Sequence, residues 1–418
     1  MFYQRLSIII LAIAFFSGSL IFLEMALASV NWQPYNIAQV TTPTPSITPK
    51  AAIERLFTSK EVASSWFAPN FLKQVPITQI RSIISSIKGQ LGNYQEVKRD
   101  GNDYVVIFDQ GSLPTNIVVN SRQQISGLRF KSPILKVSSL EKVVKDFQAL
   151  PGKVSFLVLE NSSVKAGLNT KEPLAVGSAF KLAVLKALKS QIAAGKHSWK
   201  EVVTLREDKK SLPSGILQTW PDNSPLTVQT LASLMISVSD NTATDILIDL
   251  VGREAIESIT PRNRPFFTTR ELFVLKATGN DKLLQRYRQG KEKQRRQILG
   301  EIEKLPLPDV NQFIGTNPKA LDMEWFFTAE ELCGLMKEVG DLPLMSINPG
   351  VADAKDWQRV AFKGGSEPGV LNLTTWLQGK NGKQYCVVGT WNNSNAPVDE
   401  VGFSTLYGGA ISLLAEGK

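Results

Sequence analysis

Histidine and cysteine are scarce in this 418-residue chain, which has one histidine and two cysteines. The single histidine, His197, lies in the polar segment 195–198, a setting typical of a surface loop. This scarcity excludes a Ser-His-Asp triad and a multi-histidine metal site, and one histidine with two cysteines does not complete a zinc site. We therefore predict no metal and no cofactor. A hydrolase built from this chain must take its base from lysine, aspartate or glutamate.

The two cysteines, Cys333 and Cys386, are too few for a disulfide scaffold. The first falls in a helical pattern and the second in a strand pattern. Two outcomes remain open: a bridge formed in an oxidising compartment, or two buried free thiols.

The chain also lacks the alternation of basic and aromatic residues typical of nucleic-acid binding, although its net charge is +9. We predict no nucleic-acid partner, and the positive charge suits an anionic envelope surface. The densest basic cluster, at residues 286–296, is predicted to be the solvated face of a helix, with a polyanion contact as the alternative.

The N-terminus has the pattern of an export signal. Arg5 precedes an uncharged, mostly apolar run at 7–23, and Ala26-Leu27-Ala28 supplies small residues before a cleavage point. Residues 1–28 are predicted to be a signal peptide, with an uncleaved membrane anchor over residues 6–23 as the alternative. In both cases the folded part is exported, periplasmic or extracellular. Any membrane contact is predicted through this segment alone.

Residues 29–50 are rich in threonine and proline and are predicted to be a linker. Residues 51–132 follow as a small α+β unit with a clear amphipathic helix at 77–91 and four short strand patterns. This order resembles the NTF2-like cone fold. The unit has no histidine and no paired carboxylates, so a structural or positioning role is expected, with a small-ligand pocket as the alternative.

The second domain is predicted at residues 133–418. A buried strand at 154–159 lies near its start, and three more strand patterns (359–362, 371–377 and 384–391) lie near its end. Helical patterns fill the region between them, and a final helix spans about 398–414. A sheet is thus assembled from both ends of the domain around an inserted helical block. A cleft is expected where the two parts meet.

Three short motifs in this domain occur in contexts that favour one site. Ser178 and Lys181 open a helix after a strand, where residues three apart lie on one face. The chain has other Ser-x-x-Lys matches, so this motif alone is weak. Ser239-Asp240-Asn241 lies between two helices, and Lys363-Gly364-Gly365-Ser366 is predicted to end a strand.

This ordered set resembles the penicillin-recognising serine hydrolases, most closely the class A β-lactamases, over roughly residues 133–418. The resemblance implies a β-lactamase-like fold, with a five-stranded antiparallel sheet flanked by helices and an all-helical subdomain inserted. It also implies the catalytic roles. Ser178 is the acylated nucleophile, Lys181 its proton acceptor, and Ser239 the shuttle toward the leaving nitrogen.

The resemblance further implies four substrate-binding residues, Asn241, Lys363, Gly365 and Ser366. Asn241 holds the amide side chain of the substrate and helps to position Lys181. Lys363 holds a substrate carboxylate and, beside Lys181, helps to lower the pKa of that lysine. The backbone N–H groups of Ser178 and Ser366 form the oxyanion hole.

The sequence departs from the family pattern in three ways. Gly364 stands where a threonine or serine hydroxyl is usual, and no arginine occurs between residues 370 and 377 to replace it. The Glu-x-x-Leu-Asn signature that carries the deacylating glutamate is absent after Asn241. Glu257, Glu271 and Glu324 are nearby in sequence, but no motif assigns any of them to the cleft.

The predicted function is an exported serine hydrolase that forms an acyl-enzyme at Ser178, opens β-lactam-type amides and turns over weakly. Its partner is a small β-lactam or a peptidoglycan-like substrate. The alternatives are a D-Ala-D-Ala peptidase or esterase of the envelope, and a non-catalytic relative that binds β-lactam or peptidoglycan.

Overall fold

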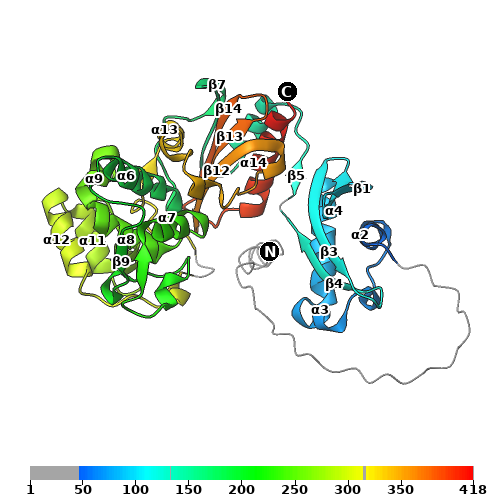
Figure 1. Ribbon diagram of the computed structural model, residues 1–418, viewed down its shortest axis with the longest axis horizontal. Helices are drawn as coiled ribbons and strands as arrows, with labels where there is room; N and C mark the ends of the chain where they lie inside the picture. The colour runs from blue at the N-terminus through cyan, green and yellow to red at the C-terminus, as the bar shows by residue number, and fades with distance from the viewer. Residues whose placement is uncertain (1–46, 132, 314–316, 418) are drawn as a thin grey trace, which may run out of the picture. The chain divides into compact units, whose positions relative to one another are not determined.

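The computed structural model describes residues 47–131, 133–313 and 317–417. The predicted signal peptide or anchor, and most of the predicted linker, lie outside the described residues. Within them, no helix combines the length and the apolar character needed to cross a bilayer. The chain divides into two compact units, residues 1–136 and 137–418, which are described separately below (Figure 1).

The N-terminal unit packs helices against one antiparallel sheet. Its helices are α2 (Pro49–Thr58), η1 (Ser64–Trp66), α3 (Pro69–Gln74) and α4 (Ile77–Leu91). Its strands are β1 (Tyr94–Asp100), β2 (Asp103–Phe108), β3 (Gly111–Val119), β4 (Ile125–Phe130) and β5 (Ile134–Leu135). The sheet order is β1-β2-β3-β4, and β5 pairs with β3. The small α+β unit expected from the sequence is thus present, whereas its likeness to NTF2 stays a prediction.

The C-terminal unit is built on a five-stranded antiparallel sheet in the order β12-β13-β14-β6-β7. Its strands are β6 (Lys153–Glu160), β7 (Ser163–Leu168), β12 (Trp357–Glu367), β13 (Val370–Gly379) and β14 (Gln384–Asn392). Segments more than 200 residues apart meet here, since β14 pairs with β6. The predicted fold class is confirmed by this sheet and the helices around it.

Helices cover both faces of this sheet. Successive strand residues point to opposite faces, so Phe156 packs on α5 (Leu140–Gln148) and α14 (Glu400–Ala415), while Leu157 packs on the other side. That other side is covered by α13 (Ala329–Val339), against which α6 (Lys181–Ala193) packs. Cys333 of α13 forms a disulfide with Cys386 of β14, so of the two outcomes left open for the cysteines, the bridge is the one present.

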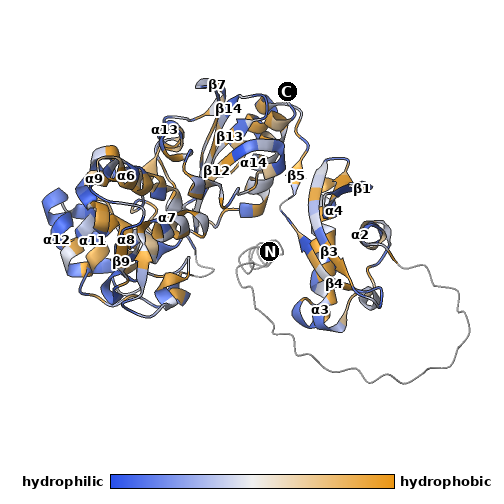
Figure 2. Ribbon diagram, viewed as in Figure 1, coloured by the Kyte–Doolittle hydropathy of each residue, from blue (hydrophilic) through white to orange (hydrophobic). Residues whose placement is uncertain are grey.

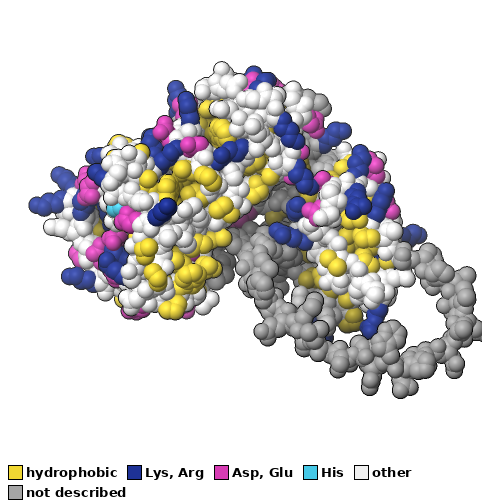
Figure 3. Space-filling view, viewed as in Figure 1, with side chains coloured by type: hydrophobic (Ala, Val, Ile, Leu, Met, Phe, Trp, Pro, Cys, Tyr) yellow, Lys and Arg dark blue, Asp and Glu magenta, His cyan; other side chains and the backbone are white. Residues whose placement is uncertain are grey.

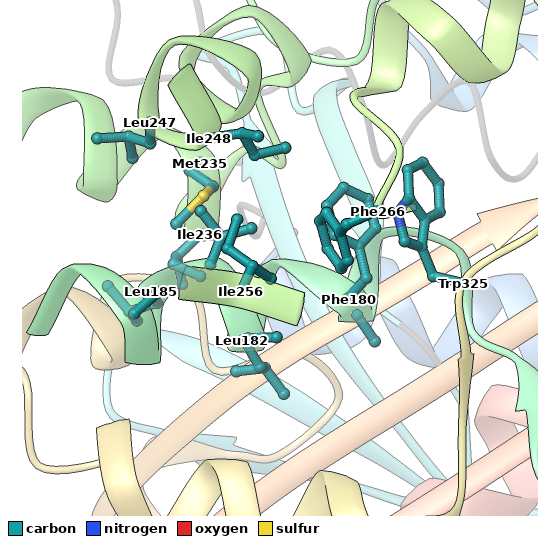
Figure 4. Packing of buried hydrophobic residues seen from close by; sticks show 14 of the residues in the cluster. Phe180, Leu182, Leu185, Met235, Ile236, Leu247, Ile248, Ile256, Phe266 and Trp325 are labelled. Carbon is teal, nitrogen blue, oxygen red and sulfur yellow. The ribbon is translucent and has the colours of Figure 1, made fainter. Parts of the chain in front are cut away.

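The inserted block is mainly helical, and its apolar side chains pack with α6 and one face of the sheet in a single core. Its α-helices are α7 (Val228–Ser237), α8 (Asn241–Val251), α9 (Arg253–Ile259), α10 (Thr269–Lys276), α11 (Asp281–Gln289) and α12 (Glu292–Ile302). The short elements are β9 (Val202–Thr204), η3 (Glu207–Lys209), η4 (Leu217–Thr219), β10 (Pro225–Thr227) and η5 (Val310–Gln312). Figure 4 shows aliphatic side chains and an aromatic group, including Phe180, Phe266 and Trp325, filling this core.

The basic cluster at 286–296 lies on α11 and α12, which Figure 2 shows as largely hydrophilic. Arg286 pairs with Glu301, and Arg288 pairs with Asp322. These ion pairs fit the predicted solvated face.

Candidate active site

The segment that carries Ser178 is held by a short strand pair. β8 (Leu174–Ala175) pairs with β11 (Phe326–Phe327), and the N–H of Val176 donates to the carbonyl of Trp325 at 3.0 Å. Gly177 then adopts a positive φ of 47° and begins a 3-10 turn, η2 (Gly177–Phe180), which leads into α6. Phe180 stacks on Trp325 with ring centroids 3.7 Å apart. The turn is anchored on both sides, and Ser178 stays partly exposed.

Lys181 follows at the start of α6 and is fully buried. Its Nζ donates to the carbonyl of Ser239 at 2.6 Å, to Ser239 Oγ at 3.0 Å and to Asn241 Oδ1 at 2.7 Å. Among the described residues, no hydrogen bond joins Lys181 Nζ to Ser178 Oγ. Three acceptors match the three donors of an ammonium. Loss of one proton leaves two donors and a lone pair that can accept from a hydroxyl.

The pKa of Lys181 lies well below its ordinary value, first because the side chain is buried and then because Lys363 is near. Asp240 and Asp245 oppose this effect but do not cancel it. Burial also lowers the pKa of Lys363, to about 7. The site therefore holds two lysines that lose their protons far more readily than lysines in water.

The loop that carries Ser239 connects α7 to α8 and is built on Asp240. Oδ1 of Asp240 caps α8 by accepting from the N–H of Ala243 at 2.8 Å. Oδ2 accepts from the N–H groups of Ile216 at 2.7 Å and Leu217 at 3.0 Å. Ser239 itself has a φ of +57°, which side-chain-bearing residues rarely adopt. The helix cap and the site are thus parts of one arrangement.

A neighbouring loop completes this arrangement with a residue that the sequence did not single out. Ser214 Oγ donates to the carbonyl of Ser239 at 2.8 Å, and the Ser214 carbonyl accepts from the N–H of Asn241 at 3.0 Å. Asn241 Nδ2 donates to the carbonyl of Leu212 at 3.0 Å. Ser214 belongs to no recognisable motif, so only the folded chain reveals its contact with the site.

Lys363 and the residues after it bring the third motif to the same place. The sequence predicted that Lys363-Gly364-Gly365-Ser366 ends a strand. In the structure β12 continues to Glu367, so the motif lies inside the last part of the strand. Lys363 Nζ donates to Ser239 Oγ at 3.1 Å. One serine hydroxyl therefore lies within hydrogen-bond distance of both lysine amines.

Gly365 permits the close approach of β12 to the turn that carries Ser178. A Cβ at position 365 would lie 2.3 Å from the backbone N of Ser178 and 2.3 Å from the carbonyl oxygen of Val176. From the other side, a Cβ at Gly177 would lie 3.2 Å from the backbone N of Ser366. The N–H groups of Ser178 and Ser366 thus come from two segments in direct contact.

Packing restricts Gly364 as well. A Cβ there would lie 2.9 Å from Cζ of Phe362 and 3.2 Å from the carbonyl oxygen of Asn372. The missing threonine or serine hydroxyl at this position therefore cannot be restored by substitution alone. The ring of Phe362 must move first.

The three glutamates considered from the sequence are each engaged elsewhere. Glu257 pairs with Arg296, Glu271 with Arg253, and Glu324 with Lys276, which also pairs with Glu367. Among the described residues, none of the three glutamates hydrogen-bonds to Ser178, Lys181 or Ser239. Among the described residues, no carboxylate hydrogen-bonds to Ser178, Lys181, Ser239 or Lys363, whereas the carboxyl of Glu400 interacts with the side chain of Ser366. The described residues also show no group of three or more histidine, cysteine, aspartate or glutamate side chains that could hold a metal ion.

Comparison with known proteins gives a family match for part of this unit. Residues 137–294 match the family model described as the beta-lactamase enzyme family. The matched region contains Ser178, Lys181, Ser239 and Asn241 and ends before Lys363. A search of curated proteins found no match.

Solved structures are similar over about two thirds of the chain. A beta-lactamase from Sphaerobacter thermophilus DSM 20745 shares 19% identity with a TM-score of 0.46, covering 66% of this chain and 96% of its own. PBP-A shares 16% identity with a TM-score of 0.45, covering 66% of this chain and 94% of its own. A variant of the class A beta-lactamase of the last common ancestor of Gram-negative bacteria shares 15% identity with a TM-score of 0.46, covering 67% and 100%.

Proposed function

We propose that the C-terminal unit is a serine hydrolase that forms an acyl-enzyme at Ser178, opens β-lactam-type amides and releases the product slowly. One observation carries this proposal. The hydroxyl of Ser239 lies 3.0 Å from Lys181 Nζ and 3.1 Å from Lys363 Nζ, and both amines have a lowered pKa. Such a chain of groups can accept, relay and deliver a proton near neutral pH.

In the proposed acylation step, Ser178 Oγ attacks the carbonyl carbon of the substrate and its proton passes to neutral Lys181 Nζ. The negative charge that develops on the carbonyl oxygen is bound by the N–H groups of Ser178 and Ser366. The bond from the carbonyl carbon to the leaving nitrogen or oxygen then breaks. Ser239 delivers a proton to the leaving atom and is reprotonated from the lysines. The product is an ester at Ser178. The leaving amine of a β-lactam stays tethered to the acyl group, whereas an acyclic amide or ester releases a free amine or alcohol.

Slow release of the acyl group from Ser178 is expected from the contacts that the glutamates make. Hydrolysis of the ester needs a base that directs a water molecule at the acyl carbon. Glu257, Glu271 and Glu324 are each held in an ion pair, and none of them hydrogen-bonds to Ser178, Lys181 or Ser239. We therefore propose that acylation is faster than deacylation.

The test is intact-mass analysis of the purified protein during incubation with a fluorescent penicillin. We expect a single covalent adduct on wild type, slow return to the unmodified mass, and no adduct on Ser178→Ala. If wild type and Ser178→Ala behave alike with every β-lactam and activated ester tried, the hydrolase proposal is wrong. Rapid loss of the adduct contradicts slow release alone.

Two other functions compete with this one. A peptidase or esterase acting on envelope substrates would use the same residues on a different acyl donor. A non-catalytic relative that binds β-lactam or peptidoglycan would leave Ser178 unmodified. The reduced carboxylate contact around Gly364 favours an acyl donor that does not depend on a carboxylate.

We also propose that the chain is exported to the periplasm or beyond, with residues 1–28 as signal peptide or anchor. The Cys333–Cys386 disulfide supports this proposal, because disulfides persist in oxidising compartments. Fractionation of cells that produce the full chain tests it. Recovery in the cytoplasm with both thiols free would contradict it.

A further inference from the structure

Exposed apolar side chains gather beside Ser239. Seven large hydrophobic side chains are exposed in the described residues, and three of them, Ile216, Val238 and Ile347, have exposed fractions of 48%, 46% and 58%. Figure 3 shows hydrophobic side chains covering a broad area of the C-terminal unit on the side that carries α7. Burial of apolar surface is favourable, so such an exposed group is a candidate binding surface.

Hydrogen bonds bring the segments that carry these three residues close to the Ser239 loop. Val238 directly precedes Ser239. The N–H of Ile216 donates to Asp240, the residue that follows Ser239. Ile347 precedes Asn348, whose side-chain amide donates to the carbonyl of Ser237 at 3.1 Å. We name Ile216, Val238 and Ile347 the apolar rim.

The polar contacts of the site are few on the same side. Lys363 is the one cation that the third motif supplies, Gly364 offers no hydroxyl, and β13 has no arginine from Val370 to Leu377. A carboxylate on the leaving group would meet one lysine whose charge is partly lost at neutral pH, because burial lowers its pKa to about 7. An uncharged apolar leaving group does not need the charge of Lys363, and contact with the rim would bury part of its apolar surface.

We propose that the apolar rim binds the leaving group of the substrate, and that the preferred acyl donors are esters or amides whose leaving group is uncharged and apolar. This inference rests on the proposed function, because Ser239 is the group assigned to protonate the leaving atom. A leaving group that receives its proton from Ser239 lies next to the loop that carries Val238. The acyl part stays on Ser178 and does not contact the rim.

The experiment varies the two halves of an ester separately. In the first series, phenylacetate esters of methanol, butanol and hexanol are hydrolysed, and released phenylacetate is followed by chromatography. Full transfer of one methylene from water is worth about fourfold in affinity, and a rim that stays partly open retains roughly twofold. We expect kcat/KM to rise about 30-fold from the methyl to the hexyl ester.

Substitutions in the apolar rim test whether this rise in kcat/KM comes from contact with the rim. Val238→Ser and Ile347→Ser are each expected to reduce the ratio of hexyl to methyl kcat/KM by about threefold or more. Val164→Ser is the matched control, since Val164 is 63% exposed on β7, outside the rim. In the second series, p-nitrophenyl acetate and hexanoate keep the leaving group constant, and the rim variants are expected to leave that ratio unchanged.

The outcomes separate this inference from the function on which it rests. If wild type hydrolyses all three phenylacetate esters at equal kcat/KM, the rim does not bind the leaving group and the inference is wrong while the hydrolase stands. The inference is also wrong if the rise persists in both rim variants, or if they change the acyl series instead. If no ester is hydrolysed while a penicillin still forms an adduct on Ser178, the inference is wrong and the hydrolase stands; if neither esters nor penicillin modify Ser178, both proposals are overturned.

Discussion

Replacing Lys363 by methionine should shift the pH dependence of acylation upward. In the proposed mechanism, acylation needs neutral Lys181, so its rate is expected to rise with pH through the pKa of that lysine. In the wild-type protein, burial and then the charge of Lys363 lower this pKa. Methionine removes the charge and keeps the burial. The pKa of Lys181 should therefore rise in Lys363→Met, yet stay below the ordinary value of 10.5.

The structure sets the size of this shift. Both amines contact Ser239 Oγ, at 3.0 Å and 3.1 Å, so the two nitrogens are at most about 6 Å apart. At an effective dielectric constant of about 20, two unit charges at this distance repel by roughly 3 kcal/mol, or about 2 pKa units. Lys363 is only partly protonated near pH 7, which reduces the observed shift. We expect about 1 to 2 units.

The assay is the second-order rate constant for acylation by an activated ester between pH 5 and pH 10, read as the midpoint of its rising limb. The midpoint is used because Lys363→Met also removes a substrate contact and lowers the rate at every pH. Lys363→Arg is the matched control, since it keeps the charge at all pH values and should hold the midpoint at or below that of wild type. If the midpoint of Lys363→Met equals that of wild type or lies below it, the coupling between the two lysines is refuted.

Three further changes probe the framework around the site. Gly365→Ala should lower the free energy of unfolding by about 2 kcal/mol, measured by denaturant unfolding, and should slow acylation, because its Cβ would collide with the backbone of Ser178; unchanged stability and rate would contradict the close approach. Lys276→Met should lower the free energy of unfolding by about 3–5 kcal/mol, because it leaves Glu324 buried without its partner. Adding Glu324→Gln should recover most of that loss. If the effects of the two substitutions are simply additive, the pairing is contradicted. Reducing the Cys333–Cys386 bridge, which joins residues 53 apart, should lower the free energy of unfolding by about 4 kcal/mol. The Tm should then fall by roughly 10 °C in scanning calorimetry. An equal Tm in reducing buffer would contradict this expectation.

The sequence predicted the parts of the fold that have strong local patterns. The helix at 77–91 and the strand at 154–159 are apolar at regular spacing, and both are present as α4 and β6. β7 was missed because its apolar residues, Val164, Ala166 and Leu168, alternate over only six positions that are mostly exposed. The cysteine pairing stayed open because it depends on the packing of α13 against β14, and no local pattern reports that contact.

At the candidate site, the sequence supplied the residue types but not the contacts. Ser178, Lys181, Ser239, Asn241 and Lys363 were selected by motif, and their assigned roles remain predictions. One carboxylate oxygen of Asp240 caps α8, and the other holds the loop that carries Ile216. This contact joins residues 24 apart in the sequence, and neither segment has a local pattern that predicts it.

The protonation state of Lys181 decides whether its amine can accept the proton of Ser178. As an ammonium, Nζ uses all three donors on Ser239 and Asn241, so it has no capacity to accept a proton from Ser178. Burial and Lys363 favour loss of one of these protons, after which the amine has a lone pair. Asp240 and Asp245 favour the ammonium, but neither carboxylate hydrogen-bonds to Nζ, and the effect of burial is the larger one. A site that activates its serine with a neutral lysine in this way is suited to acylation. It reaches hydrolysis only if water is directed by a group outside these contacts.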